Sequence, residues 1–261
     1  GDWIHGAPEI TEIGVREALR ALGGEPETAS VRVEISGGGG WRDLPAWPPA
    51  STPHPLELTA DGRLLASGTA HEAGALTSRY DPADPTPDAG GRTLNPFSAG
   101  RRDQRRREGR DDVLLFTGEP LTAPLLVMGS PEIGLTLAST NPRVDVFVRL
   151  CEVDERGRSR TVTDGYLRLP PPAAAGEPRE VRIVLAPIAH RFAAGGRLRV
   201  QVSWGAHPLH LRNPGTSDPV RDHSRLVAST QTLFLGGATP AVLALPLPDD
   251  AAPAVHPGVP R

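Results

Sequence analysis

Lysine is absent from this sequence, and cysteine almost so. All 28 basic residues are arginine, which together with the abundance of alanine, glycine and proline suggests a GC-rich bacterial genome and indicates no function. The single cysteine, Cys151, excludes an internal disulfide framework. It lies within an alternating apolar run, which favours a buried structural thiol over the alternative of a reactive nucleophile.

Long apolar runs and a marked excess of one charge are also lacking. No run approaches the roughly 20 apolar residues of a membrane-spanning helix, and the first residues lack the charged and then apolar regions of a secretory signal. We therefore expect a soluble cytoplasmic protein without a membrane partner. The formal net charge of -3 gives no general attraction to nucleic acid.

Short alternating apolar runs are abundant from residue 111 onward. Between residues 144 and 150 the alternation is strict, with the period of two of a strand in a packed sheet. About eight such runs without a credible helix predict a mainly β fold, an antiparallel sandwich or jelly roll. One face of the clearest run carries Val144, Val146, Val148 and Leu150, and the other carries Asp145, Phe147, Arg149 and Cys151. Further runs cover residues 161–169, 181–185, 198–202, 230–235 and 242–247.

The first 110 residues have a different pattern. Helical spacing of apolar residues over 9–22, followed by two glycines, predicts a helix, and residues 31–35 alternate like a strand. The glycine run 37–40 lacks the GxxxxGK[ST] continuation of a phosphate-binding loop, so we expect a simple turn. Residues 51–109 are rich in proline, glycine and aspartate, which predicts an extended connection with short strands near 56–58 and 64–65.

Candidate sites of chemistry are few. The arginine-rich run 101–110 reads as a solvated loop whose arginines pair with carboxylates, or as a nucleic-acid patch; the lack of interleaved aromatic residues favours the first reading, so we expect no nucleic-acid partner. A G-x-S-x-G nucleophile elbow is absent, because the sequences around Ser98 and Ser203 each lack the first glycine. His190, between Pro187 and a glycine pair, is predicted to be a structural turn histidine.

A histidine and aspartate cluster near residue 210 suggests a metal site at first sight. Pro208 and the surrounding turn residues prevent a helical pair of histidines, and no cysteine or glutamate completes the set. We therefore predict a surface loop, with no metal and no cofactor. The cluster consists of His207, His210, Asp218, Asp222 and His223.

Five segments carry compact motifs that follow one another along the chain. Residues 1–6 read GDWIHG, residues 40–49 read GWRDLPAWPP, and residues 80–91 contain YDPADP and a glycine pair. Residues 110–121 read RDDVLLFTGEPL, and residues 212–216 read RNPGT. In this order the segments resemble the C-terminal part of the CocE/NonD hydrolases, the family of X-Pro dipeptidyl-peptidases, cocaine esterase and related acyl hydrolases.

The resemblance implies a fold and a missing partner. The family has a catalytic α/β-hydrolase domain with a Ser, Asp, His triad and a C-terminal jelly roll similar to galactose-binding folds. His5 matches the triad histidine, whereas the nucleophile and the acid have no counterpart here, and Asp2 replaces the proline of the family's G-P-W. The implied organisation is 1–36 as a short α/β remnant of the hydrolase domain, 37–110 as a connecting segment with short strands, 111–247 as the C-terminal β-sandwich and 248–261 as a tail.

Two functions follow from different classes. The first is the C-terminal domain of a serine hydrolase, which packs on an α/β-hydrolase domain and shapes its acyl or peptide pocket. It contributes His5 if that partner supplies the serine and the aspartate, and alone it is expected to be inactive. The second is a stand-alone binding module for a carbohydrate or a protein, in which Trp41, Trp47 and Trp204 are candidates for stacking on a sugar ring. Either could form homo-oligomers.

Overall fold

Strands make up most of the secondary structure of the protein, here a computed structural model that describes residues 8–23, 31–93, 97, 99–171, 176–218, 221, 224–237 and 240–250. The helices are α1 (Pro8–Leu22) and α2 (Arg105–Glu108). The first strands are β1 (Val31–Ile35), β2 (Gly40–Leu44), β3 (Ser51–Leu58), β4 (Arg63–Ala66), β5 (Gly74–Tyr80), β6 (Val113–Gly118), β7 (Leu125–Gly129) and β8 (Glu132–Ser139). The remaining strands are β9 (Val144–Val153), β10 (Ser159–Leu169), β11 (Arg179–Val184), β12 (Ile188–Phe192), β13 (Arg197–Ser203), β14 (Ser229–Leu235) and β15 (Ala241–Pro248).

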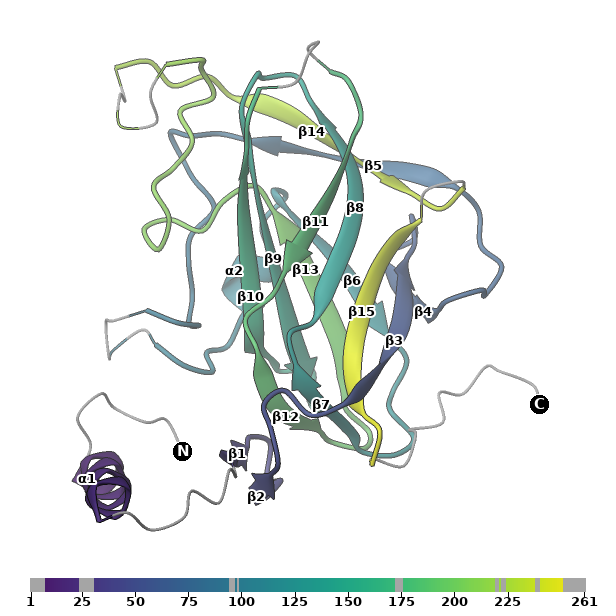
Figure 1. The fold of residues 1–261 in the computed structure, drawn as a ribbon. Coiled ribbons are helices and arrows are strands. Elements are labelled where there is room, and N and C mark those ends of the chain that lie inside the picture. The colour runs from purple at the N-terminus through teal and green to yellow at the C-terminus, as the bar shows by residue number, and fades with distance from the viewer. Residues whose placement is uncertain are drawn as a thin grey trace.

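The strands form a β-sandwich. One hydrogen-bonded path runs β10-β9-β13-β6-β4-β3-β15-β8-β14-β5, and β11 pairs with β8. The pairs along it are antiparallel except β4 with β6, where two residues of each strand pair in parallel. The path folds over at this point, so that β3, β15 and β8 lie in front of β6, β13 and β9 (Figure 1). The two layers bury their facing side chains, as the sequence pattern predicts.

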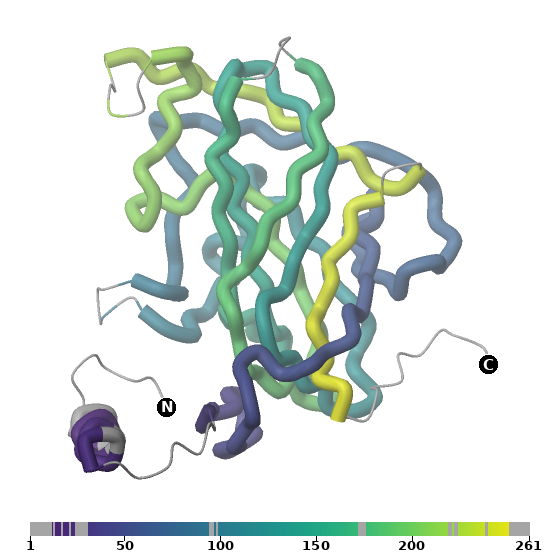
Figure 2. Tube along the Cα trace, in the orientation of Figure 1, coloured from purple at the N-terminus to yellow at the C-terminus, as the bar shows by residue number. Residues whose placement is uncertain are grey.

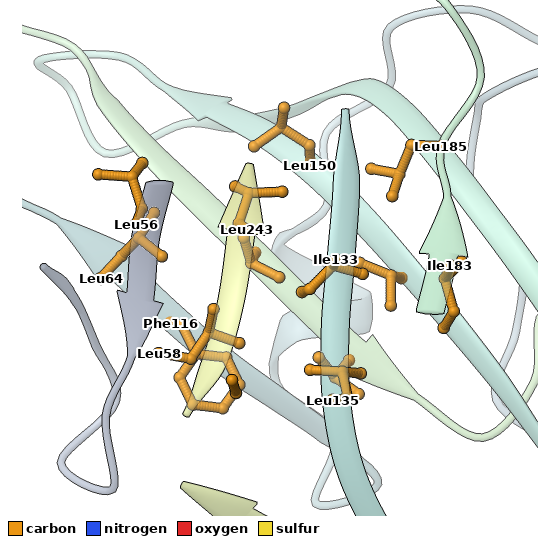
Figure 3. Packing of buried hydrophobic residues seen from close by; sticks show 14 of the residues in the cluster. Leu56, Leu58, Leu64, Phe116, Ile133, Leu135, Leu150, Ile183, Leu185 and Leu243 are labelled. Atoms are coloured by element: carbon orange, nitrogen blue, oxygen red, sulfur yellow. The ribbon is translucent and has the colours of Figure 1, made fainter. Parts of the chain in front are cut away.

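The core lies between these layers and consists mainly of aliphatic side chains, with a few aromatic ones such as Phe116 (Figure 3). The predicted inward face of β9 is confirmed, since Val146, Val148 and Leu150 are fully buried within it. Complete burial of an aliphatic side chain is worth about 1.5–3 kcal/mol, so this set supplies much of the stability. Other fully buried members are Leu58, Phe116, Val127, Ile133, Leu137, Val200, Val202, Leu233, Leu243 and Leu245.

Residues 51–80 contribute more strands to the sandwich than their composition suggests. β3 begins at Ser51, ahead of the expected 56–58, and pairs over its whole length with β15. Pro53 and Pro55 are tolerated because β4 pairs only with residues 56–58 of β3. β5, which the sequence analysis did not predict, pairs with β14.

Of the N-terminal elements, α1 lies apart from the sandwich, whereas the ribbon that follows it is joined to β12 through Ser36. The predicted helix and first strand are confirmed as α1 and β1, and β1 forms a two-stranded ribbon with β2. Figure 2 shows α1 at one edge of the molecule. Its side chains Val15, Leu19 and Leu22 are 53%, 64% and 84% exposed, so α1 presents an uncovered apolar face. In the described part of the chain no helix has the length and apolar character needed to cross a membrane.

Candidate functional site

The second face of β9 is polar but equally buried. Asp145, Phe147, Arg149 and Cys151 are each at most 2% exposed. The described residues between 81 and 112, which we call the strap, lie over this face, as the hydrogen bonds described below show. The sequence predicts the composition of the face but not its burial, because the strap resembles a solvated connection.

Arg149 anchors the strap. Its Nη1 donates to the backbone oxygen of Ala89, at 2.6 Å, and to Oε1 of Gln104, at 3.0 Å. Its Nη2 lies 2.8 Å from a carboxylate oxygen of Asp88 and 3.2 Å from one of Asp164 on β10. A fully buried guanidinium requires such paired carboxylates, because an uncompensated charge in the interior is costly. The strap therefore supplies part of the neutralisation of a core arginine.

Arg107, from the arginine-rich run, is the second buried guanidinium. It lies on the one-turn helix α2 and is 2% exposed. Its Nε donates to Gln201 at 3.0 Å, its Nη1 to the backbone oxygen of Pro87 at 2.6 Å, and its Nη2 to Ser203. Burial and, next, the neighbouring charge of Arg149 lower the pKa of Arg107 to about 9. The expectation of a solvated loop is therefore wrong for Arg107, which fixes the strap to β13.

Three other arginines of the run pair with carboxylates, as expected, whereas Arg102 donates to the backbone oxygens of Ala99 and Phe97. Arg101 pairs with Glu152 on β9, and Arg105 bonds Asp103 at 3.0 Å. Arg110 bonds Asp112 at 2.7 Å. Burial of Arg107 among exposed neighbours follows from the short helix, which turns one side chain of the run toward the sheet.

The motif segments that are distant in the sequence meet over this face. Tyr80 donates its hydroxyl to the backbone oxygen of Asn213 at 3.2 Å, and Arg212 bonds that of Pro82 at 3.1 Å. Asn213 donates to Asp145 on β9 at 3.0 Å. The YDPADP and RNPGT segments are thus held together and onto the sheet.

The segment that opens β6 joins the same cluster. Thr86 donates to Asp112 at 2.7 Å, and Arg110 Nη2 donates to the backbone oxygen of Asp84 at 2.9 Å. Gly91 has a φ of 77°, and a Cβ there would lie 2.5 Å from an oxygen of Asp164. A side chain at this position would displace Asp164, so the glycine of the motif permits the close approach of the strap.

Asp145 is the centre of a polar group beside the strap. Arg168 binds both of its carboxylate oxygens, at 2.8 and 2.7 Å, and the Tyr166 hydroxyl donates to one of them at 2.9 Å. The imidazole of His210 stacks on Tyr166 with a centroid distance of 3.8 Å, and burial lowers the pKa of His210. His210 is therefore a packing residue.

The other members of the histidine and aspartate cluster do not join it as ligands. No group of three or more potential metal ligands gathers within the residues that the structure describes. His207 is only half-buried, and its backbone bridges the strap at Pro87. Asp218 pairs with Arg225 at 3.9 Å. Asp222 and His223 lie outside the described residues.

His190 corrects another prediction. It lies on strand β12 and is 1% exposed, so it is a core residue and not a turn histidine. Its Nδ1 is 2.7 Å from Oγ of Ser36, its Nε2 is 3.5 Å from Oε2 of Glu152, and its ring packs edge-on against Phe192. The alternation in residues 188–192 (IAHRF) was the signal that identifies this strand.

The remaining candidates have structural positions. Trp204 is fully buried and donates to Ser78 at 2.6 Å, which excludes it from stacking on a ligand; Trp41 is 49% exposed and Trp47 is half-buried. Cys151 is fully buried, as predicted for a structural thiol, and this burial raises its pKa to about 12. His5 lies outside the described residues.

Comparison with known proteins gives a consistent result. The sequence profile of the X-Pro dipeptidyl-peptidase C-terminal non-catalytic domain matches residues 26–244. The cocaine esterase of Rhodococcus sp. (strain MB1 Bresler) is 31% identical over 89% of this chain but only 44% of its own length. A putative serine esterase of Mycobacterium tuberculosis is 29% identical over 72% of this chain and 34% of its own. The chain thus spans less than half the length of these relatives.

Solved structures share the fold. An α-amino acid ester hydrolase is 28% identical and superposes with a TM-score of 0.75 over 89% of this chain and 44% of its own. An aminopeptidase from a Thaumarchaeota archaeon has a TM-score of 0.78 at 24% identity, covering 90% of this chain and 43% of its own. A CocE/NonD family hydrolase of Staphylococcus aureus has a TM-score of 0.63 at 17% identity, over 92% and 46% of the two chains.

Proposed function

This chain belongs to the family of X-Pro dipeptidyl-peptidase C-terminal non-catalytic domains, as found in the CocE/NonD hydrolases. We propose that it packs on an α/β-hydrolase domain and forms one wall of that domain's acyl or peptide pocket. The observation that carries this proposal is the convergence of the YDPADP, RDDV and RNPGT segments over the polar face of β9. Such a buried polar layer holds the strap in one place, as a pocket wall requires.

The side of the molecule that carries the strap also offers apolar contact surface. Phe97 of the strap is 88% exposed, and Leu211, next to the RNPGT segment, is 59% exposed. In Figure 1 the strap, the loop after β13 and α1 all lie on the left of the sandwich. Exposed apolar groups of this size are typical of an interaction surface. We propose that the hydrolase domain covers this side, including the apolar face of α1.

His5 is proposed as the general base of the assembled enzyme. Residues 1–36 would then be the end of the hydrolase domain, which brings His5 to a serine and an aspartate of the partner. Acyl transfer needs all three groups together with an oxyanion hole, because an imidazole alone neither supplies the nucleophile nor stabilises the oxyanion. We therefore propose that His5 contributes to catalysis only in the complex.

The test of this function begins with the neighbouring coding sequence. A frame that encodes a G-x-S-x-G elbow is expected next to the frame of this chain, and its product is co-expressed with it. Co-purification and hydrolysis of nitrophenyl esters or X-Pro-nitroanilides are expected, and turnover falls by about 10⁴-fold in His5→Ala. Two polypeptides that do not associate, or turnover that survives His5→Ala, would contradict the proposal.

The docking surface is tested separately. Phe97→Asp combined with Leu211→Asp is expected to weaken association by at least about tenfold, because two apolar contacts are replaced by desolvated charges. Val184→Asp is the matched control, since Val184 is also exposed, at 55%, but lies on β11 outside the strap. Equal effects of the two substitutions on the dissociation constant would place the interface elsewhere.

The isolated chain is expected to show no turnover that depends on His5. The purified wild type and His5→Ala are compared with nitrophenyl ester and X-Pro-nitroanilide substrates, and equal rates are expected because the partner's serine and aspartate are missing. A faster wild type would show that this chain contains a complete His5-dependent site.

A stand-alone binding module is the second class of function. Of the three tryptophans considered for sugar stacking, only Trp41 is well exposed, and Arg32 already lies over its ring at 5.8 Å. A tryptophan fluorescence titration with mono- and oligosaccharides tests this alternative. The strap convergence favours the hydrolase reading.

The finer features of the fold and setting are also proposals. The antiparallel sandwich supports a jelly-roll, galactose-binding-like topology. The single cysteine and the arginine-only basic composition fit a cytoplasmic protein of a bacterium, which cell fractionation tests. Homo-oligomerisation through the exposed face of α1 is tested by light scattering of the isolated chain.

A further inference from the structure

Ser36, His190 and Glu152 lie in a row at the base of the β1–β2 ribbon, where Glu152 also pairs with Arg101 of the strap. Oγ of Ser36 is 2.7 Å from Nδ1 of His190, and Nε2 of the same ring is 3.5 Å from Oε2 of Glu152. Ser36 is exposed, whereas His190 is buried and the Glu152 side chain is 13% exposed. A hydroxyl that is open to solvent, a buried imidazole and a carboxylate in this order are the parts of an activated nucleophile.

The carboxylate is held in its charged form. Burial opposes ionisation of Glu152, but the His190 imidazole, the backbone N–H of Ala193 at 2.9 Å and the Arg101 guanidinium together lower its pKa to about 2. An ionised carboxylate on one side of the ring favours a proton on Nε2 and leaves Nδ1 free to accept the serine proton. Compared with serine proteases, the two ring nitrogens exchange roles.

The turn after Ser36 leaves the hydroxyl accessible. Gly37 has a φ of 78°, and a Cβ on it would lie 2.2 Å from the backbone oxygen of Arg191 and 3.0 Å from Cε1 of His190. Glycine is therefore required for the turn to approach His190. Gly38 follows with a φ of 82°, and within the described part of the chain the N–H groups of Gly37 and Gly38 have no acceptor. Backbone N–H groups without an acceptor are the kind of donor that stabilises an oxyanion.

We propose that Ser36 is a reactive serine, with His190 as its base and Glu152 as a positioning residue, and that it accepts acyl groups from small esters that carry a negative charge. In the first step Oγ forms a bond to the acyl carbon and its proton passes to Nδ1. The alcohol then leaves with its bonding electrons and takes that proton. Water releases the acid by the reverse route, so no further reactant is needed.

The adjoining cavity sets the class of substrate. It has a volume of about 470 Å³ and reaches the row at Glu152 and at Gly37, the residue after Ser36. The rest of its lining includes Asp154, Glu155, Arg156, Arg158 and Arg160. Asp154 is paired with Arg158 at 2.8 Å and Glu152 with Arg101. Arg156 and Arg160 form no ion pair within 4.0 Å among the described residues, although Arg160, after the hydrogen bonds of Arg105, helps to lower the pKa of the nearby Asp103 carboxyl. These two charges face a carboxylate or phosphate of the substrate.

A second arrangement of the same protons gives a purely structural contact. The Ser36 hydroxyl also lies 3.0 Å from the backbone oxygen of Ala189, to which it can donate. If Nδ1 carries a proton, the imidazole donates to Oγ and the contact only fastens the ribbon to β12. This arrangement predicts an unreactive serine, so the reactivity of Ser36 distinguishes the two arrangements.

The test uses the full chain and a fluorophosphonate probe. Attack of Oγ on phosphorus forms an O–P bond and expels fluoride, so a reactive serine gains a covalent adduct that peptide mass spectrometry locates. Labelling of Ser36 in the wild type is expected, with loss of the adduct in Ser36→Ala. The matched control is Ser67→Ala: Ser67 is exposed and its hydroxyl donates to Glu57 at 2.6 Å, so it has a carboxylate but no imidazole as acceptor. Absence of labelling at Ser36, or equal labelling of Ser67, would overturn the proposal.

The role of Glu152 is read from rates and not from stability. Glu152→Gln is expected to slow labelling by about tenfold or more at a temperature where circular dichroism shows the variant folded. The preference for a negatively charged substrate is tested by comparing the hydrolysis rates of 4-nitrophenyl acetate and 4-nitrophenyl hemisuccinate. The hemisuccinate should be hydrolysed faster by the wild type, and this difference should disappear in the double variant Arg156→Gln, Arg160→Gln. Both measurements are compared with Ser36→Ala, and neither involves His5. A negative result would therefore not contradict the proposed hydrolase function. A labelling rate unchanged in folded Glu152→Gln would contradict the assignment.

Discussion

The two faces of β9 are buried to the same degree by opposite means. One face places Val146 and Val148 against the aliphatic side chains of the facing layer. The other face carries Arg149, which the strap satisfies through hydrogen bonds and an ion pair, and Asp145, which accepts a hydrogen bond from Asn213 of the RNPGT segment. The first face tolerates any close-packed apolar partner, whereas the second requires particular atoms at particular places. The apolar face therefore stabilises the fold, and the polar face specifies where the strap lies.

Breaking the apolar face should have the largest effect. Val146→Asp buries a carboxylate without a partner, and we expect a loss of at least about 4 kcal/mol, enough to unfold the chain. Urea denaturation followed by circular dichroism measures it. Val184→Asp, at an exposed position of β11, is the control and should cost under about 0.5 kcal/mol. A folded Val146→Asp protein with the same midpoint as wild type would contradict the assignment of this face.

Breaking the polar face should cost somewhat less. Arg149→Met removes the fully buried guanidinium that pairs with Asp88 and Asp164, and among the described residues it leaves Asp164 only the exposed Arg92, at 3.4 Å, as an ion-pair partner. We expect a loss of about 3–5 kcal/mol. Urea midpoints of the variant and of Arg182→Met provide the comparison. Arg182 also pairs with a carboxylate, that of Glu132, but its side chain is 73% exposed, so its removal should cost about 0–1 kcal/mol. Similar losses in the two variants would show that burial of the ion pair is unimportant.

The contribution of the Glu152 carboxylate to stability is expected to depend on pH. Its pKa is lowered from 4.5 to about 2 on folding, so its stabilising contribution is complete above about pH 4.5 and is lost as the pH falls toward 2. Glu152→Gln has no ionisable group at this position, so protonation of residue 152 cannot change its stability in this pH range. We expect the variant to be about 1–2 kcal/mol less stable at pH 7 and the difference to vanish near pH 2. Thermal midpoints of both proteins between pH 2 and pH 7 test this, and parallel curves would refute it.

Removal of the N-terminal segment should have the smallest effect. α1 belongs to neither face of β9, and its described apolar side chains are exposed. Deletion of residues 1–30 is therefore expected to change the thermal midpoint by only a few degrees. Deletion of residues 1–44 serves as the contrast, because it also removes the ribbon and the Ser36 bridge to β12. A large loss of stability on the shorter deletion would show that α1 is part of the folded core.

Local periodicity was enough to predict the strands that build the sandwich. β9, β13, β14 and β15 carry clear alternation, and β10 carries it with an irregularity between Thr161 and Thr163. The observed bounds of all five strands agree with the expected runs within a few residues. β5 (GALTSRY) was missed because its inward positions include Ser78, which is buried as the acceptor of a tryptophan N–H. A strand whose buried side is polar has no apolar alternation to detect.

The polar site was beyond the reach of sequence periodicity. Nothing local separates Arg107 from the exposed arginines beside it, because its burial depends on Gln201 and Ser203 nearly a hundred positions later. The pairing of Ser36 with His190 spans 154 positions and depends on the ribbon reaching β12. Motif resemblance did predict which segments matter around the strap, but only the fold shows that they share one surface.

The burial of Cys151 has a practical consequence for measuring how this sandwich opens. The thiol lies in the middle of β9 beneath the strap, fully buried, and burial raises its pKa to about 12. A thiol reagent in neutral buffer can therefore react only with molecules in which β9 has separated from its cover, and there is no other thiol in the chain to obscure the signal. The rate of reaction of Cys151 with a coloured disulfide reagent therefore reports the rate at which the native sheet opens around β9.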